Sequence, residues 1–317
     1  MPNDVQLKLV YIFIDLIAPL VFGYLCRYQR RLGDNFFSSM MNINILTFYP
    51  TLSVLSFWVV RLDFELIWLP VFGVILGLIP GAAAYLWSAK KYDDYLERGS
   101  YIIAAILSNF GTLGGLCAFI IYGETGFAYV QLAVLLQNVV LFMFCFPLAQ
   151  YYYHQSRDTG RHDATLADIL LNKNQLPVLG LVIGATLYYL GIPRPQFLGD
   201  LFNPLVHIAA WSALIPIGYS IDLAEMRRYY WRILDLIPIK FVVTPLVGYL
   251  LARLVITDEK VINTLLILAS TPTAINAVVT AKLHNLNVNI AMAAFVLTTA
   301  VHLLVVFPAI FFWIFSR

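Results

Sequence analysis

Apolar segments long enough to cross a lipid bilayer follow one another along almost the whole chain of 317 residues. A transmembrane helix needs about 20 consecutive, mostly apolar residues. Segments of roughly this length run over 7–25, 36–58, 64–87, 100–122, 126–150, 174–191, 200–221, 234–255, 261–283 and 288–314. We therefore expect an all-α polytopic membrane protein with ten transmembrane helices.

The composition excludes a soluble globular protein. Hydrophobic residues make up 61% of the chain, charged residues 12%, and the mean hydropathy is +0.79, whereas soluble domains carry about 25% charged residues. Membrane lipid is therefore the expected surrounding of the protein, and no nucleic-acid partner is expected.

Basic residues near the ends of the segments predict how the chain is oriented, because Lys and Arg are retained on the cytoplasmic side. Four alternate loops carry three basic residues each: Arg27, Arg30 and Arg31; Lys90, Lys91 and Arg98; Arg157, Arg161 and Lys173; Arg227, Arg228 and Arg232. We expect both termini outside and the protein in the cell (plasma or inner) membrane. With five helices in each half, the two halves enter the membrane from opposite faces.

The two halves also match in sequence at a constant offset of 161 residues. The matching positions are Ile106-Leu107 with Ile267-Leu268, Thr112 with Thr273, and Phe146-Pro147 with Phe307-Pro308. We expect two inverted five-helix repeats, residues 1–150 and 174–317, joined by a cytoplasmic connecting loop and short amphipathic helix at 151–173.

Two apolar segments are interrupted near their middle by glycine, proline and small polar residues. The first interruption is Ser108-Asn109-Phe110-Gly111-Thr112-Leu113-Gly114-Gly115, and the second is Ser270-Thr271-Pro272-Thr273-Ala274-Ile275-Asn276. Hydrocarbon offers no hydrogen bonds, so broken helices persist there mainly where the freed backbone faces protein or a water-filled cavity. A matched pair of such breaks is typical of a secondary transporter.

Motifs along nearly the whole chain resemble those of the auxin efflux carrier family. They are Ala18-Pro19-Leu20-Val21-Phe22-Gly23-Tyr24, Asn44-Ile45-Leu46-Thr47-Phe48-Tyr49-Pro50, Asn109 through Gly114 with Tyr122-Gly123-Glu124-Thr125-Gly126, Ile239-Lys240-Phe241-Val242-Val243-Thr244-Pro245, and Pro272-Thr273-Ala274-Ile275-Asn276 with Ala281-Lys282. The resemblance implies that helices 4 and 9 are broken and cross at mid-membrane. It also implies export or exchange of organic anions such as auxin or dicarboxylates. Leu116 stands where the family often has a proline after the helix 4 break, and Ala277 stands where the plant branch has a second proline in helix 9. These departures argue against plant auxin specificity.

A crossover of broken helices is suited to binding an anion. Each half-helix that begins there exposes amide N–H groups and roughly half a positive charge. We expect the substrate-binding residues to be Asn109, Gly111, Thr112, Gly114, Thr271, Pro272, Thr273, Asn276, Gln137 and Asn138. In the alternative interpretation, the Asn and Thr side chains only satisfy backbone groups freed by the breaks, and Gln137 and Asn138 only tie helices together.

Two ionisable residues within predicted spans are candidates for ion or proton coupling, because charges at that depth are costly. Asp15 lies in the first span, where it would carry a proton or sodium ion, or be a structural group paired with Lys240 or with backbone. Lys240 lies near the cytoplasmic end of the eighth span, where its alternatives are a countercharge for the substrate or a side chain that reaches the interface. His207 and His302 are interpreted as packed or interfacial.

The sequence thus favours a secondary carrier for a small organic anion that works by alternating access. One alternative is a sodium-coupled symporter resembling the bile acid carriers, and a less favoured one is an intramembrane enzyme. Enzyme activity, a cofactor and a bound metal are not expected, because the chain has no P-loop, no metal-binding spacing and no clustered acids within its spans. A homodimer is compatible with the sequence.

Overall fold

The computed structural model describes residues 10, 12–29, 33–61, 63–157, 176–221 and 229–315. Within these ranges the secondary structure consists of helices and one isolated β-bridge, with no strand or sheet. The prediction of an all-α chain is confirmed for this part. The predicted amphipathic piece after residue 163 lies outside the described residues, and the helix before it continues to Arg157, beyond the expected end of the span at 150.

Proline positions explain where the long helices change their winding. The π-helical turns η1 (Ile12–Ile17), η2 (Asn44–Phe48), η6 (Leu141–Cys145), η9 (Ile239–Val243) and η10 (His302–Val306) each end two residues before a proline. A proline cannot donate to the carbonyl one turn back, so the preceding turn widens. The π-helical turn η4 (Phe110–Gly114) has Leu116 at that place, and glycines supply its freedom instead.

Five stretches of the described residues are helices long and apolar enough to cross a membrane. They are Phe64–Ser88, Phe110–Ser156, Gln196–Ser220, Leu236–Val255 and Val288–Ile314. The other predicted spans are shorter, broken or only partly described, so the ten-helix inverted repeat stays a prediction.

The chain divides into two compact units, each combining segments of both sequence halves. Unit 1 contains Met1–Leu66, Gly111–Leu132 and Leu170–Ile221; unit 2 contains Ile67–Phe110, Ala133–Ile169 and Asp222–Arg317. The predicted repeats and the compact units are therefore different divisions of the chain.

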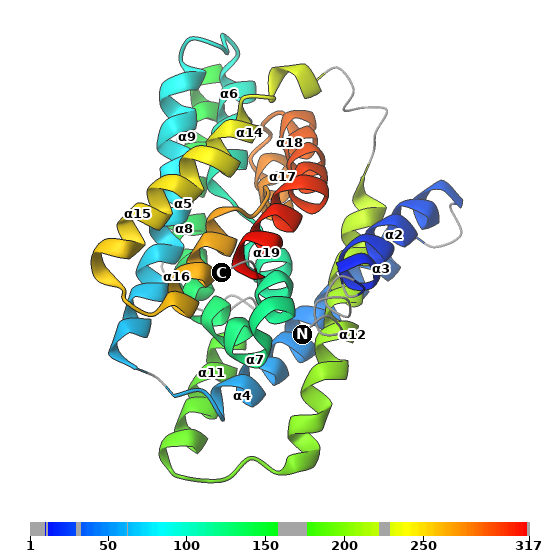
Figure 1. Ribbon diagram of the computed structural model, residues 1–317. Coiled ribbons are helices and arrows are strands. Elements are labelled where there is room, and N and C mark those ends of the chain that lie inside the picture. The colour runs from blue at the N-terminus through cyan, green and yellow to red at the C-terminus, as the bar shows by residue number, and fades with distance from the viewer. Residues whose placement is uncertain are drawn as a thin grey trace. The chain divides into compact units, whose positions relative to one another are not determined.

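Unit 1 is built from two pairs of closely packed helices. Its helices are α2 (Ala18–Gln29), α3 (Asp34–Ile43), α4 (Tyr49–Phe57), α11 (Leu176–Tyr189), α12 (Gln196–Ser220) and most of α7 (Gly115–Ala133). Helix α2 packs on α12, and α4 packs on α11 (Figure 1).

Glycines permit these close approaches. A Cβ atom at Gly218 would lie 2.1 Å from the Leu20 carbonyl oxygen, and one at Gly184 would lie 2.4 Å from that of Val54. Small residues at such contacts are typical of helix packing within membranes.

Unit 2 contains the remaining helices. They are α5 (Trp68–Ser88), α6 (Tyr95–Ile106), α8 (Gln137–Val140), α9 (Phe146–Arg157), α14 (Leu236–Pro238), α15 (Thr244–Val255), α16 (Glu259–Ala269), α17 (Ile275–Leu283), α18 (Val288–Val301) and α19 (Phe307–Phe315), with the 3-10 turns η5 (Val134–Leu136) and η8 (Tyr230–Arg232). The 3-10 turn η3 (Phe64–Ile67) has all its residues but Ile67 in unit 1. Helix α6 lies beside α5 and α9 (Figure 1).

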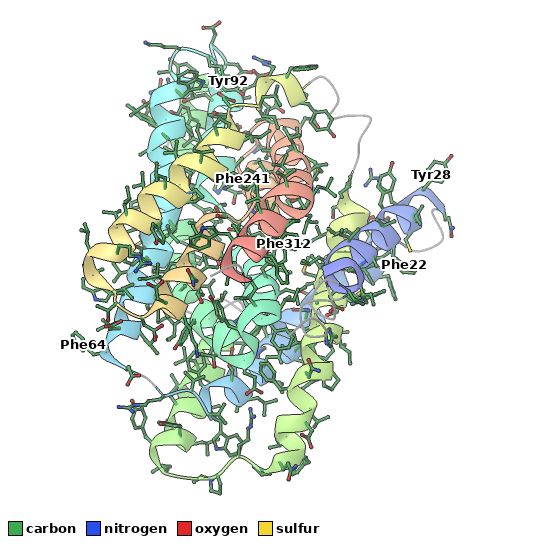
Figure 2. The ribbon with its side chains drawn as sticks, viewed as in Figure 1. Phe22, Tyr28, Phe64, Tyr92, Phe241 and Phe312 are labelled. Carbon is green, nitrogen blue, oxygen red and sulfur yellow. The ribbon has the colours of Figure 1, made fainter. Side chains whose placement is uncertain are left out.

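Apolar side chains are exposed in rows along the helices, as expected for surfaces that face lipid. On α15, Leu246, Leu250 and Leu254 are 56%, 56% and 78% exposed and follow each other at four-residue spacing. Figure 2 labels further exposed aromatic side chains, among them Phe22 on α2 and Phe312 on α19. Contiguous exposed apolar surface of this kind marks contact with a membrane or a partner.

Candidate functional site

Two helices of unit 2 end abruptly within apolar sequence. Helix α6 ends at Ile106, where Leu107 takes the extended backbone angles φ −80° and ψ 103°. Helix α16 ends at Ala269, and α17 begins at Ile275 after an extended Ala274. Both helices end because the residues that follow them bond their own backbone or cannot continue a helix.

The two gaps pair with each other through their backbones. The Asn109 N–H donates to the Pro272 carbonyl at 2.8 Å, and the Ala274 N–H donates to the Leu107 carbonyl at 2.8 Å. Ser108 and Thr273 thereby form an antiparallel bridge. Each break thus satisfies backbone groups freed by the other, which is what apolar surroundings demand.

Side chains from three other segments satisfy the carbonyl end of α6. Thr273 Oγ1 donates to the Ala104 carbonyl at 2.8 Å, and Lys240 Nζ donates to the Ala105 carbonyl at 2.9 Å. Gln137 Nε2 donates to the Ser108 carbonyl at 3.0 Å. Ala104 and Ala105 lie in the last turn of α6, where carbonyls lack amide partners one turn ahead. The Ser108 carbonyl, beyond the helix, also accepts a hydrogen bond from the Phe110 N–H at 2.9 Å.

The carbonyl end of α16 is satisfied in a similar way. Thr271 Oγ1 donates to the Leu268 carbonyl at 2.7 Å, and His302 Nδ1 lies 2.8 Å from the Ser270 carbonyl, which makes this nitrogen the donor. The Thr273 N–H donates to Thr298 Oγ1 at 3.0 Å. His302 is therefore buried and hydrogen-bonded to the second break, a role that its position in an apolar segment did not indicate.

The donor end at the paired breaks differs from the carbonyl ends. The N-cap residue of α17 is Ala274, which makes no side-chain cap bond, and a helix leaves its first amides without carbonyl partners one turn back. The Ala277 N–H donates to the Ala274 carbonyl at 3.1 Å. Asn276 lies in this turn and is exposed, while Asn109 is buried. The structure thus brings Asn109, Thr271, Pro272, Thr273, Gln137 and Lys240 together, with Asn276 one turn along α17.

The other predicted binding residues have separate surroundings. Gly111 and Thr112 belong to unit 1 with Gly114, and Thr112 Oγ1 accepts a hydrogen bond from Tyr49 Oη at 3.2 Å. A Cβ atom at Gly111 would meet nothing within 4 Å. The Asn138 side chain lies outside the described part of the structure.

Lys240 turns inward rather than toward an interface. Its side chain is 1% exposed, and Nζ also donates to Ser108 Oγ at 2.8 Å. The alternative in which this side chain reaches the interface is therefore wrong for this structure. Its helix places it over the end of α6, where oxygen acceptors are available.

Asp15 forms a second polar cluster, within unit 1. His207 Nδ1 lies 2.5 Å from Asp15 Oδ2, and Trp211 Nε1 donates to Asp15 Oδ1 at 3.2 Å. Asp15 is 2% exposed. Its partners are thus His207 and Trp211 rather than Lys240 or backbone. His207 and Trp211 are four residues apart and so lie on one face of α12. This spacing is the sequence feature that could have indicated the cluster.

Comparison with known proteins decides the class. A family model described as "Membrane transport protein" matches residues 11–312. The chain belongs to this family. The resemblance to auxin efflux carriers is thereby confirmed, and this membrane transport protein is an integral membrane transporter of a small-molecule substrate. The family is one of transporters and not a class of enzymes.

A relative supports the same class over the full length. An uncharacterized transporter from Methanocaldococcus jannaschii is 25% identical over 321 residues, which cover 99% of this chain and 98% of the relative. Its description adds no substrate.

Proposed function

We propose that this transporter is a secondary carrier that exports or exchanges a small organic anion by alternating access, with a carboxylate of the substrate bound at the crossover in unit 2. The proposal rests on a difference in hydrogen bonding between the helix ends at the two breaks. The carbonyl groups at the breaks accept hydrogen bonds from internal donors, whereas Ala274, the N-cap residue of α17, gives the first turn of that helix no side-chain cap bond. A ligand therefore meets hydrogen-bond donors, and donors at a helix N-terminus select an anion.

Within this proposal the residues have two roles. Asn109 and Asn276 contribute amide groups to the carboxylate, and the α17 amides contribute N–H donors. Thr271, Thr273 and Gln137 hold the crossover in place through the bonds described above. The remaining proposed contacts with the substrate in unit 2 come from Pro272 and Asn138.

The proposal extends to topology and energy source. It places ten helices in two inverted repeats in the cell membrane, with both termini outside and a homodimer as one assembly. The anion follows its own gradient and the membrane potential, which contributes about 2.3 kcal/mol per charge per 100 mV.

A thermal-shift screen of the purified protein tests the proposal. Monocarboxylates, dicarboxylates, amino acids and indole acids are compared on the wild type, on Asn109→Ala and on Asn276→Ala. Asn289→Ala, on α18 outside both breaks, is the matched control. We expect at least one carboxylate to raise the melting temperature of the wild type and the control, and to do so much less in the two crossover variants. An equal rise in all four proteins would remove the crossover as the binding site.

A further inference from the structure

Lys240 has a buried amino group whose hydrogen-bond partners are uncharged. Its two hydrogen-bond acceptors are the Ala105 carbonyl at 2.9 Å and Ser108 Oγ at 2.8 Å. The carboxylates of unit 2 that form ion pairs do so elsewhere: Asp235 with Lys91, Glu97 with Arg232, and Glu259 with Arg253. Among the described residues, therefore, no carboxylate is paired with Lys240.

A buried ammonium group without an anionic partner is costly. The end of α6 compensates part of this cost, because a helix C-terminus carries roughly half a negative charge. About half of the ammonium charge remains without a counter-ion. An ammonium group has three N–H donors, and two of them have acceptors here.

We propose that Lys240 supplies the fixed positive charge of the transport site. Its ammonium group lies at the carbonyl end of α6, where oxygen acceptors would otherwise suit a metal cation, and the carboxylate of the substrate is its counter-ion. This inference rests on the proposed function and specifies it: the site takes anions with at least one full negative charge, and it takes them without a sodium ion at the α6 end.

The first part of the test needs no substrate. Lys240→Ala removes the ammonium and leaves space beside the same two oxygens, so methylammonium chloride should restore the missing cation. We expect 100 mM-scale methylammonium to raise the melting temperature of Lys240→Ala by at least about 2 °C relative to choline chloride. The wild type and Lys282→Ala, which removes an exposed lysine on α17, should not change. If methylammonium does not raise the melting temperature of Lys240→Ala, the proposal that Lys240 supplies a fixed positive charge is overturned.

The second part measures anion affinity with succinate and indole-3-acetate as probes. Lys240→Gln keeps hydrogen-bond donors and removes the charge, and Lys240→Arg keeps the charge. We expect the dissociation constant of a probe that binds the wild type to rise about 30-fold or more in Lys240→Gln and to be much less affected in Lys240→Arg. The wild-type value should be equal in sodium and choline chloride. Unchanged affinity in Lys240→Gln, or binding that requires sodium, would overturn the counter-ion role.

The two parts separate this inference from the proposed function. If neither probe, nor any acid of the wider screen, binds the wild type, the proposed function and the counter-ion role both fail. The methylammonium effect on Lys240→Ala would then show a cation that serves only the fold. If Lys240→Ala does not fold, the Gln and Arg variants decide the outcome.

Discussion

Replacing Thr273 by valine tests whether the crossover depends on hydrogen bonds between the two breaks. Thr273 is fully buried, and its hydroxyl donates to the Ala104 carbonyl at 2.8 Å. Valine has nearly the same shape and no hydroxyl. Ala104 lies in the last turn of α6, and Leu107 leaves the helix before a following amide can reach that carbonyl. The substitution therefore leaves a buried carbonyl without its donor.

The magnitude follows from this loss. A buried polar group left without a partner costs about 1–3 kcal/mol, while single hydrogen bonds in membrane proteins average about 0.6 and reach about 1.7 kcal/mol. We expect the free energy of unfolding to fall by about 1–2 kcal/mol. Thr264→Val is the matched control: Thr264 is fully buried in α16, and its hydroxyl donates to the Lys260 carbonyl within the same helix. That carbonyl keeps its helical amide donor, so the control should cost about 0.5 kcal/mol or less.

The assay is equilibrium unfolding in mixed micelles with an increasing fraction of a denaturing detergent, followed by circular dichroism. The comparison between the two variants cancels the general effect of a valine in a membrane helix. If Thr273→Val costs no more than Thr264→Val, the crossover is held by packing alone, and the hydrogen-bond account of the breaks is wrong.

Three further predictions concern packing and ion pairs. Gly218→Ala should lower the free energy of unfolding by about 1–3 kcal/mol in the same assay. Gly115→Ala should be neutral or stabilising, because its Cβ would meet only ordinary contacts at 3.7 Å or more. Equal effects of the two substitutions would refute the close-approach argument. Asp15→Ala should lower the free energy of unfolding by about 1–3 kcal/mol, because it removes the buried carboxylate that accepts a hydrogen bond from Trp211 and pairs with the part-exposed His207. Asp15→Asn should cost less, and a fully stable Asp15→Ala protein would contradict this. Glu97→Gln should lower the free energy of unfolding by about 1 kcal/mol, since its partner Arg232 is 44% exposed. This loss should shrink in high salt, and a salt-independent loss would point to packing instead.

The helical character, the apolar spans and the places where the helices break were predictable from sequence, because each depends on a local property. Mean hydropathy and segment length identify the spans that the described structure contains as long helices. Small polar residues with glycine or proline identify the two breaks, whose ends at Ile106 and Ala269 fall within a few residues of the predicted interruptions. Prolines account for five of the π-helical turns by the loss of an amide donor.

Only the tertiary structure decided which side chains meet. Lys240 bonds a serine 132 positions away, and Asp15 pairs with a histidine 192 positions away. Such pairs depend on how each helix is rotated about its axis and how far it is shifted along its neighbour. In a chain that is apolar on nearly all sides, the hydrophobic pattern carries little information on either quantity, because lipid and protein neighbours are equally apolar. The positions of the polar groups were therefore set by sequence, and their partners by packing.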